Sequence, residues 1–392
     1  MEEKRTAPSY TLRQLVQYFL KLGYAGFGGP VALVGYMHRD LVEDKKWISE
    51  EEYKDGLALA QLAPGPLAAQ LSIYLGYVHY KLIGATLVGA AFVLPSFAMV
   101  VAIGMAYKMF GGLPWMQAIF YGVGSAVVGI ITISSYKLAE KSISKFNTKA
   151  VRQHWLLWLF FLAAAVTTII TQREEILLFV IVGLLYMIVK APPKWIKRPL
   201  VANSVFLLGI GFWEYDANTL VKIGWFFAKA GAFVFGSGLA IVPFLHGGVV
   251  EEYKWLTEHE FIDAVAVAMI TPGPVVITVG FIGYLVAGFP GATVAALATF
   301  LPCYLFTVLP APYFQKYGRN PSIKAFVDGI TAAVVGALAG AVIVIAIRTI
   351  KDIPTALIAL GTIVVLLRYK KVKEPLIILV AALTGIFLKL LL

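Results

Sequence analysis

Two Pro-Gly-Pro triplets interrupt apolar stretches of the chain: Pro64-Gly65-Pro66 in "QLAPGPLAAQL" and Pro272-Gly273-Pro274 in "MITPGPVVITV". Proline supplies no N–H and suits the first turn of a helix, so Pro66 and Pro274 can each begin a new half-helix. The N–H groups that follow have no acceptor within that helix and form its positive end, which binds anions. The triplets therefore predict two anion-binding helix N-termini.

Each triplet has a second break upstream, at Gly28-Gly29-Pro30 in "GYAGFGGPVA" and at Gly236-Ser237-Gly238 in "GAFVFGSGLA". Glycine lets a backbone N–H approach a ligand closely. Four breaks, two from each half of the chain, can thus converge on one oxyanion. The alternative is that glycine and proline only kink packed membrane helices. The recurrence of both breaks at matched positions favours the binding site.

Titratable side chains lie close to these breaks in the sequence. Lys21 and Lys229 each precede a glycine break by seven residues inside an apolar segment. A lysine within the membrane is a functional candidate, and snorkelling to the interface is the alternative. The candidates for ion or proton coupling, for which a structural role is the alternative, are His38, His246, Asp55 and Asp263.

Other kinds of site find little support in the composition. Cys303 is the one cysteine, and the five histidines lack a metal-ligand spacing, so neither a metal nor another cofactor is predicted. The chain also lacks the GxxxxGK[ST] nucleotide loop of an ATP-driven motor, and it lacks the HExxH and GxSxG motifs of hydrolytic enzymes.

The elements that position these residues are membrane helices. Of the 392 residues 59% are hydrophobic and 14% are charged, and the mean hydropathy is +0.81. A soluble domain has about 45–50% apolar and about 25% charged residues. Apolar runs of spanning length without strict alternation predict an all-α polytopic membrane protein. The net charge of +11 resides in short loops, which indicates topology and not nucleic-acid binding.

The chain contains two copies of one unit. Residues 19–66 align without gaps to residues 227–274 at an offset of 208, and polar residues match as well as apolar ones. After a one-residue slip the match continues, and "AVVG" at 126–129 meets "AVVG" at 333–336. The predicted organisation is a first repeat over 1–190, a connecting segment over 191–217 expected to cross the membrane, and a second repeat over 218–392.

Each repeat has six predicted helical segments. They span 12–41, 54–79, 82–109, 115–138, 154–171 and 174–190, then 219–249, 260–286, 290–312, 322–347, 354–369 and 375–391. With the connecting segment this predicts about 13 transmembrane helices, an odd number that inverts the second repeat. The basic loops around 137–152, 190–198 and 368–373 then all lie in the cytoplasm, as the positive-inside rule favours. Broken helices are expected at the interface between the repeats.

The set Phe27-Gly28-Gly29-Pro30 and Pro64-Gly65-Pro66, with its echoes at Phe235-Gly236 and Pro272-Gly273-Pro274, resembles the two-domain form of the chromate ion transporter family. The resemblance covers essentially the whole chain. It implies an inner-membrane protein that exports chromate and lowers its toxicity, with sulfate as competitor or counter-anion. Ser237-Gly238 replaces Gly29-Pro30 in the second unit, so the two halves need not bind alike.

Two functions remain to be compared. The breaks alone favour a secondary transporter of an oxyanion, bound at half-helix N-termini, whose partners are that anion and the lipid bilayer. The alternative is an intramembrane enzyme acting on a lipid or polyprenyl phosphate, but the sequence offers no convincing carboxylate pair for it. Substrate, coupling ion, transport direction and oligomeric state, including a homodimer, are not fixed by the sequence.

Overall fold

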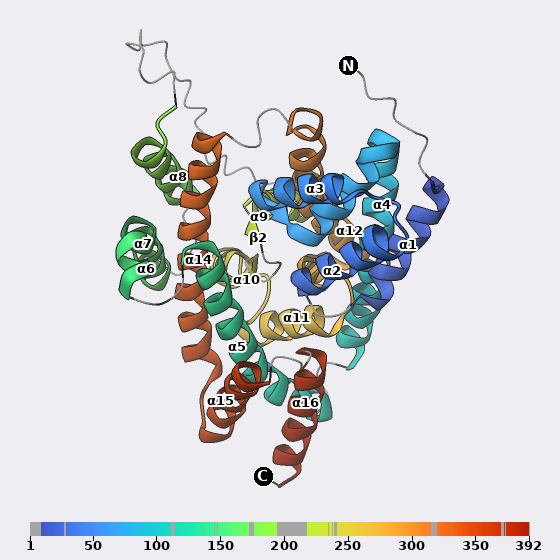
Figure 1. Cartoon of the computed structure of the whole chain (residues 1–392). Helices are drawn as coiled ribbons and strands as arrows, with labels where there is room; N and C mark the ends of the chain where they lie inside the picture. Colours follow the sequence, from blue (N-terminus) through green and yellow to red (C-terminus); the bar gives the residue numbers. More distant parts are fainter. Residues whose placement is uncertain are drawn as a thin grey trace, which may run out of the picture.

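The structure is a computed structural model that describes residues 9–26, 29–110, 114–144, 146, 148–171, 176–193, 218–233, 235–236, 238, 241–314, 320–369, 372 and 374–391. Within these ranges the regular elements are helices, apart from two strands of two residues each (Figure 1). Four helices are long and apolar enough to cross a membrane: Leu67–Phe110, Trp115–Glu140, Val275–Tyr313 and Pro321–Thr349.

The elements of the first repeat are α1 (Leu12–Ala25), α2 (Gly29–His38), η1 (Arg39–Asp44), α3 (Glu50–Leu62), β1 (Gly65–Pro66), α4 (Leu67–Phe110), α5 (Pro114–Ser142), α6 (Thr148–Gln153), α7 (Trp155–Thr171) and α8 (Ile176–Lys190). Those of the second are α9 (Thr219–Ala232), β2 (Phe235–Gly236), α10 (Ile241–His246), η4 (Gly247–Glu252), α11 (Glu258–Ile270), η5 (Val275–Ile277), α12 (Thr278–Val308), η6 (Ala311–Tyr313), α14 (Pro321–Thr349), α15 (Ile353–Arg368) and α16 (Glu374–Leu391).

Helices α1 and α2 form a hairpin that folds back at the first glycine break. The Tyr18 hydroxyl on α1 donates to the carbonyl of Tyr36 on α2 at 3.3 Å. In an unbroken helix these residues would lie roughly 27 Å apart along the axis. The chain therefore turns back between the end of α1 and the start of α2 at Gly29, and this turn is the tip of the hairpin.

Helix α3 and the first part of α4 form a second hairpin. His79 on α4 hydrogen-bonds Glu52 on α3 at 3.0 Å, and a Cβ at Gly56 would lie 2.3 Å from the Tyr74 ring. Lys81 has a φ of 52° and turns the chain, after which the rest of α4 runs on to Phe110. The tip of this hairpin is the first Pro-Gly-Pro triplet.

The open ends of these two hairpins lie together. The ring of Tyr10, before α1, stacks on Trp47, before α3, with centroids 5.0 Å apart. Its hydroxyl is 2.7 Å from Nδ1 of His79, at the end of the returning helix. The hydrogen bond from His79 lowers the pKa of Glu52 to about 2. Both hairpins of the first repeat thus enter the molecule from the same end.

The second repeat forms the same two hairpins. A Cβ at Gly248 on η4 would lie 2.0 Å from the ring of Phe226 on α9, and Thr278 donates to the carbonyl of Ala264 on α11 at 3.2 Å. Gly288, with a φ of +63°, turns the chain within α12, as Lys81 does within α4. The duplicated sequence therefore builds a duplicated structure down to its turns.

This arrangement corrects the prediction that 12–41, 54–79, 219–249 and 260–286 each cross as one helix. Each range folds back at its break. The physical reason is length, because α1 has 14 residues and α3 has 13, or roughly 20 Å of helix, while a bilayer core is about 30 Å thick. An apolar pattern gives no sign of the direction in which a chain leaves a break.

The remaining helices interleave the two repeats. A Cβ at Gly129 on α5 would lie 2.8 Å from the carbonyl of Ala359 on α15, and one at Gly336 on α14 would lie 2.1 Å from that of Phe161 on α7. Small residues allow such close backbone approach between membrane helices. The terminal helices of each repeat thus pack on the central helix of the other, around α5 and α14 (Figure 1).

Two large apolar clusters surround the hairpins. One contains Phe19 and Phe92 and encloses α1 to α4, and the other contains Phe227, Phe261 and Phe281 and encloses α9 to α12. All five of these phenylalanines are fully buried. The hairpin tips are therefore held between two packed bodies of side chains.

Candidate functional site

The four predicted breaks meet in the interior of the molecule. Strand β1 of the first repeat pairs in parallel with β2 of the second, Gly65 opposite Phe235 and Pro66 opposite Gly236. The N–H of Gly273 donates to the carbonyl of Gly26 at 2.9 Å. Both links join one repeat to the other, and each joins a Pro-Gly-Pro tip to a glycine-rich tip.

A further contact joins the two tips of the second repeat to each other. A Cβ at Gly238 would lie 3.2 Å from Cβ of Val275, the first residue of η5, and 3.6 Å from the backbone nitrogen of Val276. Gly238 is itself buried. The glycine-rich tip of the second repeat therefore lies directly against the start of the helix that follows its Pro-Gly-Pro triplet.

Both triplets interrupt their helices as the sequence leads one to expect. Helix α3 ends at Leu62 and α4 begins at Leu67, while α11 ends at Ile270 and η5 begins at Val275 with Pro274 as its N-cap. The first N–H groups of each new helix, at residues 67–69 and at 275 and 276, have no acceptor within that helix, whereas the N–H of Ile277 already donates to the carbonyl of Pro274 at 2.9 Å. Two helix N-termini thus begin at the meeting point of the tips.

The central glycines of the triplets are required by their backbone. Gly65 has a φ of +144° and Gly273 one of +95°, values that side-chain-bearing residues rarely adopt. A Cβ at Gly65 would lie 2.7 Å from the Gln70 carboxamide, and one at Gly273 would lie 2.0 Å from Oγ of Ser96. A side chain at either position would therefore strain the tip whether or not a ligand is present.

Two buried polar residues at the tips were missed from the sequence. Gln70, fully buried in the first turns of α4, donates from Nε2 to the carbonyl of Pro64 at 2.8 Å. Ser96, also fully buried, has its hydroxyl 2.7 Å from the carbonyl of Pro272 and 3.2 Å from that of Gly23. Polar residues directly after a break, or next to a helix proline such as Pro95, were the available signals.

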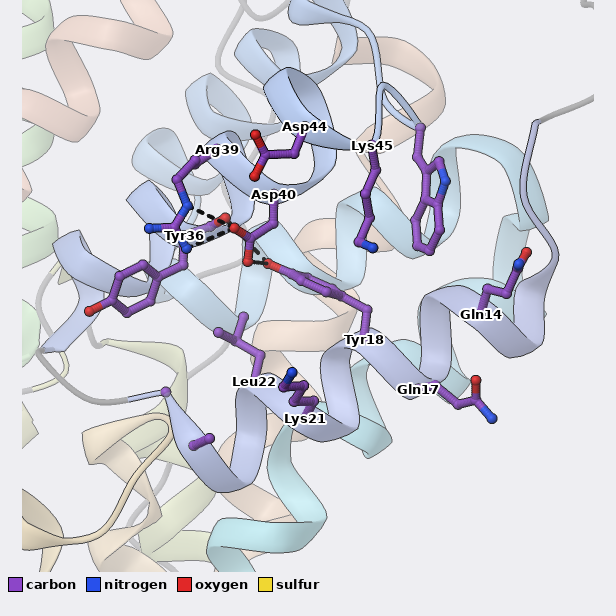
Figure 2. A pocket seen from close by; sticks show the side chains of 13 residues that line it. Gln14, Gln17, Tyr18, Lys21, Leu22, Tyr36, Arg39, Asp40, Asp44 and Lys45 are labelled. Carbon is purple, nitrogen blue, oxygen red and sulfur yellow. Dashed lines mark hydrogen bonds and ion pairs between the residues drawn. The ribbon is translucent and has the colours of Figure 1, made fainter.

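Lys21 lies on the flank of the first hairpin, where it lines a cavity of about 760 Å³ between α1 and the α2–η1 arm (Figure 2). In this view Lys21 and Lys45 project from opposite sides of the cavity. Arg39 donates to Asp40 at 2.8 Å, and Asp40 accepts from Tyr18 at 3.2 Å. The cavity lining runs from Gln14 and Trp47, near the open end, to Gly26 at the tip.

Lys229, the repeat counterpart of Lys21, has different surroundings. It is partly buried, and its Nζ lies 5.7 Å from the centre of the Trp225 ring, a cation–π contact. Lys21, by contrast, is exposed. The structure thus places both lysines on hairpin flanks and not among the four tips.

The two histidines lie at the open ends of the hairpins, bound to carboxylates. His38 contacts Glu43 at 3.0 Å and Glu50 at 2.9 Å, and hydrogen bonds from His38 and Lys54 lower the pKa of the exposed Glu50. His246, which is 2% exposed, bonds Glu258 at 2.9 Å. Both histidines therefore tie the second arm of one hairpin to the first arm of the next.

In the second repeat this cluster also contains a cation. Ligand atoms of His246, Glu251 and Glu258 lie within 4.8 Å of one another, close enough to hold a metal ion. Arg348, at the end of α14, donates to Glu251 and, at 3.1 Å, to Glu258. The guanidinium already supplies the positive charge that the two carboxylates need, so the cluster is better described as an ion-pair network.

The two aspartates also differ between the repeats. Asp263 is buried on α11 and accepts a hydrogen bond of 2.7 Å from Tyr107, which belongs to the first repeat. Asp55 is partly exposed on α3. Gly29 and Pro30 begin α2, whereas the candidates Phe27, Gly28 and Ser237 lie outside the described residues.

Comparison with known proteins gives the family. The model of the chromate transporter family matches residues 13–188 and again residues 221–386. The chain belongs to the chromate transporter family. Membership makes it a membrane transporter and not an enzyme, which removes the alternative of an intramembrane enzyme acting on a lipid or polyprenyl phosphate.

Its relatives extend over nearly the full chain. A "Chromate transport protein" of Cupriavidus metallidurans is 64% identical over 97% of this chain and 94% of its own length. A "Probable chromate transport protein" of Synechococcus elongatus is 58% identical over 97% and 96%. A "Chromate transport protein" of Pseudomonas aeruginosa is 27% identical over 96% and 92%. No solved structure matches the chain.

Proposed function

We propose that the chain is a secondary transporter that exports chromate across the cytoplasmic membrane and binds it where the four hairpin tips meet. The observation that carries this proposal is the pairing of tips from different repeats, through β1 with β2 and through Gly273 with Gly26. The names of the close relatives supply the substrate.

The binding chemistry follows from the backbone. The N–H groups at 67–69 and at 275 and 276 begin two half-helices, and each helix N-terminus carries about half a positive charge. Glycines at 28, 29, 236 and 238 let the opposing tips approach a tetrahedral anion closely. Proposed contacts also include Phe27, Pro30, Ser237 and the prolines of both triplets. Lys21 and Lys229 then act by attracting the anion, from outside the tips.

The proposed topology keeps the two repeats inverted. Four hairpins enter the membrane and return, while the second part of α4, the second part of α12 and helices α5, α7, α8, α14, α15 and α16 cross it. The connecting segment 191–217 adds one further crossing, so the number stays odd. In each repeat two hairpins replace two predicted crossings, and both arrangements leave the chain on the side where it started. Residues 140–152, 190–198 and 368–373 therefore remain cytoplasmic in this topology, and the C-terminus remains outside.

In this topology the two repeats open their hairpins to opposite sides of the membrane. The open ends of the first-repeat hairpins then face the cytoplasm, and the cavity beside α1 leads from that side toward Gly26. The open ends of the second-repeat hairpins face outward, where Arg348, Glu251, Glu258 and His246 bind one another. The open first-repeat cavity and the ion pairs of the second repeat support our proposal of a state that receives the anion from the cytoplasm and is closed to the outside.

The membrane potential suffices to drive export. An inside-negative potential contributes about 2.3 kcal/mol per charge per 100 mV. Outward movement of one anionic charge is favoured by this amount and that of two charges by about 4.6 kcal/mol at 100 mV. Uptake in a respiring cell would need coupled protons or cations, for which His38, His246, Asp55 and Asp263 are the proposed carriers.

The test is flux of labelled chromate in liposomes containing the purified protein. We expect chromate efflux to rise with an inside-negative potential. We also expect sulfate on the same side of the membrane to compete with chromate. Equal flux in protein-free liposomes would overturn the proposal. Sulfate on the opposite side, with no potential applied, distinguishes exchange from uniport.

Topology and assembly are tested separately. Single cysteines on a Cys303→Ser background, at 140–152 and near the C-terminus, should react with an impermeant maleimide from opposite sides. Labelling of both from the same side would contradict inversion. The particle mass in detergent distinguishes a monomer from the homodimer left open by the sequence.

A further inference from the structure

Gln70 is a buried amide whose side-chain oxygen, Oε1, has no hydrogen-bond partner among the described residues. It lies in the first turns of α4, is 0% exposed, and reaches back over the Pro-Gly-Pro turn to donate from Nε2 to the carbonyl of Pro64. Buried side-chain acceptors are normally satisfied, so an unpaired one at a helix N-terminus calls for a ligand.

The orientation of this amide is fixed by its neighbour. A carbonyl oxygen can only accept, and at 2.8 Å from Pro64 O the Gln70 carboxamide must present its nitrogen. Rotation of the amide would place two acceptors against each other. The free atom is therefore an acceptor, and what it lacks is a donor.

An anion that carries a hydroxyl supplies such a donor. We infer, building on the proposed function, that the first-repeat tip recognises a protonated oxyanion, the hydrogen form of the tetrahedral anion, through Oε1 of Gln70. The N–H groups at the start of α4 bind the charged oxygens, and Gln70 accepts the O–H. The helix N–H groups thus recognise the negative charge of the anion, and Gln70 recognises its proton.

This recognition distinguishes anions of similar size and shape. Chromate and hydrogen chromate interconvert near neutral pH, and arsenate also carries at least one hydroxyl there. Sulfate and selenate are fully ionised at neutral pH and have none, so they leave the buried acceptor unpaired, add negative charge beside it, and should compete with chromate only at higher concentrations than arsenate does. Sites built to bond a hydroxyl discriminate strongly against analogues that lack it.

The second repeat does not have this device. Depending on where the one-residue slip falls, Gln70 is matched by Thr278 or by Ile277. The Thr278 hydroxyl donates to the carbonyl of Ala264 at 3.2 Å, and isoleucine has no polar side-chain atom. The second-repeat tip therefore presents helix N–H groups without a comparable unpaired acceptor in the described residues. The anion is expected to bind with its hydroxyl turned toward the first-repeat tip.

The decisive experiment compares arsenate with selenate as competitors of chromate flux in liposomes. The two anions are close to chromate in size, and at neutral pH only arsenate carries a hydroxyl. We expect arsenate to inhibit at concentrations ~10-fold or more below selenate. We also expect the half-saturating total chromate concentration to rise as the pH is raised through neutrality. Equal inhibition together with a flat pH profile overturns the inference while leaving chromate transport itself intact.

Substitution of Gln70 identifies the residue responsible. Gln70→Leu removes the acceptor, so we expect the preference for arsenate over selenate to collapse to ~2-fold or less. The matched control is Ser72→Ala, which removes a fully buried hydroxyl two residues along the same helix that donates to the carbonyl of Ala69 at 2.7 Å. The control should keep the preference. Retention of the preference in Gln70→Leu would overturn the assignment.

A second variant covers the case in which Gln70→Leu does not fold. In Gln70→Glu the neutral acid can still donate to Pro64 and accept from the ligand, whereas the ionised form repels every anion. We expect its chromate flux to match the parent in acid and to fall more steeply than the parent as the pH rises. A pH profile parallel to that of the parent would contradict the role of Oε1.

Discussion

Helices α3 and α11 occupy the same position in the two repeats, begin with the same capping box, and are buried to very different extents. In α11 every residue from Phe261 to Met269 is buried. In α3 the buried residues are Tyr53, Gly56, Leu59 and Ala60. The same hairpin is therefore enclosed in one half of the molecule and open on one side in the other.

Substitutions between the two repeats account for part of this difference in burial. Arg348, which closes the second-repeat cluster by donating from Nη1 to Glu251 and Glu258, is replaced by a different residue, Lys141, at the matched position of the first repeat. Tyr107, which donates to Asp263, corresponds to Phe314, which has no hydroxyl. The duplication thus supplies two equivalent hairpin pairs, and a few substitutions make one of them hold more tightly.

The contrast teaches how such a protein could alternate between its two sides. Two similar hairpin pairs meeting at their tips can each exist in an enclosed or an open setting, and the structure has one of each. In the proposed topology the open pair faces the cytoplasm. The predictions below disturb one member of each matched pair and use the other as its control.

The largest effect is expected at the central glycines. Gly273→Ala places a Cβ 2.0 Å from Ser96 Oγ at a φ of +95°, whereas Gly65→Ala meets the more flexible Gln70 side chain at 2.7 Å. We expect losses of roughly 2–4 kcal/mol for Gly273 and roughly 1–2 kcal/mol for Gly65. Thermal unfolding in detergent and the yield of monodisperse protein measure them.

Gly35→Ala is the control for this pair, because a Cβ there meets nothing within 4 Å. It should unfold at or slightly above the parent temperature, because Gly35 lies within α2 and alanine favours a helix over glycine. If Gly273→Ala were as stable as Gly35→Ala, the geometry of the second tip would be wrong. These clashes also mean that loss of transport in a glycine variant does not by itself locate the anion.

Next in size is the removal of Arg348. Arg348→Ala leaves Glu251 and Glu258 close together without their shared cation, and we expect a loss of about 1–3 kcal/mol, reduced from the value for a fully buried pair because the group is partly exposed. Arg348→Lys, which keeps the charge, should lose less. The readout is thermal unfolding of both variants.

The same substitution should reduce the asymmetry itself. Ala58 and Ala266 are matched positions on α3 and α11; the first is partly exposed and the second is 2% exposed. On a Cys303→Ser background we expect Ala58→Cys to react with a small maleimide faster than Ala266→Cys. Adding Arg348→Ala should speed the reaction at 266 and leave that at 58 unchanged. An unchanged reaction rate at position 266 would show that the ion pairs of Arg348 do not keep the second-repeat hairpins enclosed.

A smaller effect is expected from Tyr107→Phe. It removes the donor to the buried Asp263 carboxylate and should cost about 1–2 kcal/mol in the enclosed half. Phe314→Tyr is its partner, since it introduces a hydroxyl at the matched position of the open half. A loss in the first variant with none in the second, measured by thermal unfolding, supports the asymmetry, and equal losses would argue against it.

The smallest effect is expected from the lysines. Lys21→Ala removes a charge from the cavity that leads to Gly26, where Arg39 and Lys45 remain, so half-saturation should rise by about 2–5-fold at low salt and less at high salt. Lys229→Ala should change it less, because Lys229 packs on Trp225. Initial rates against chromate concentration at two ionic strengths check both, and Lys21→Arg should behave as the parent.

Sequence reasoning predicted the helical membrane architecture, the duplication and the positions of the breaks, because proline, glycine and apolar patterning act locally. It did not predict that the chain turns back at each break. Direction at a break is decided by packing between residues far apart, such as Tyr18 with Tyr36 and His79 with Glu52.

The polar residues were predicted less well for a related reason. Lys21 and Lys229 attracted attention as charges in apolar segments, yet they lie on hairpin flanks. Gln70 and Ser96 are single uncharged residues in apolar runs, and only the folded chain reveals that each reaches the carbonyl of a triplet proline. The sequence indicates where the backbone breaks but not which side chains complete the break.

The central claim, that the anion binds where the four tips meet, is tested most directly by the anomalous scattering of chromium in crystals grown with chromate. We predict one strong anomalous peak beside the N-termini that follow Pro66 and Pro274, placed so that the oxygens bound to chromium lie within hydrogen-bonding distance of the N–H groups at 67–69 or at 275 and 276. A peak confined to the cavity lined by Lys21, Arg39 and Lys45, with none at the tips, would contradict the account.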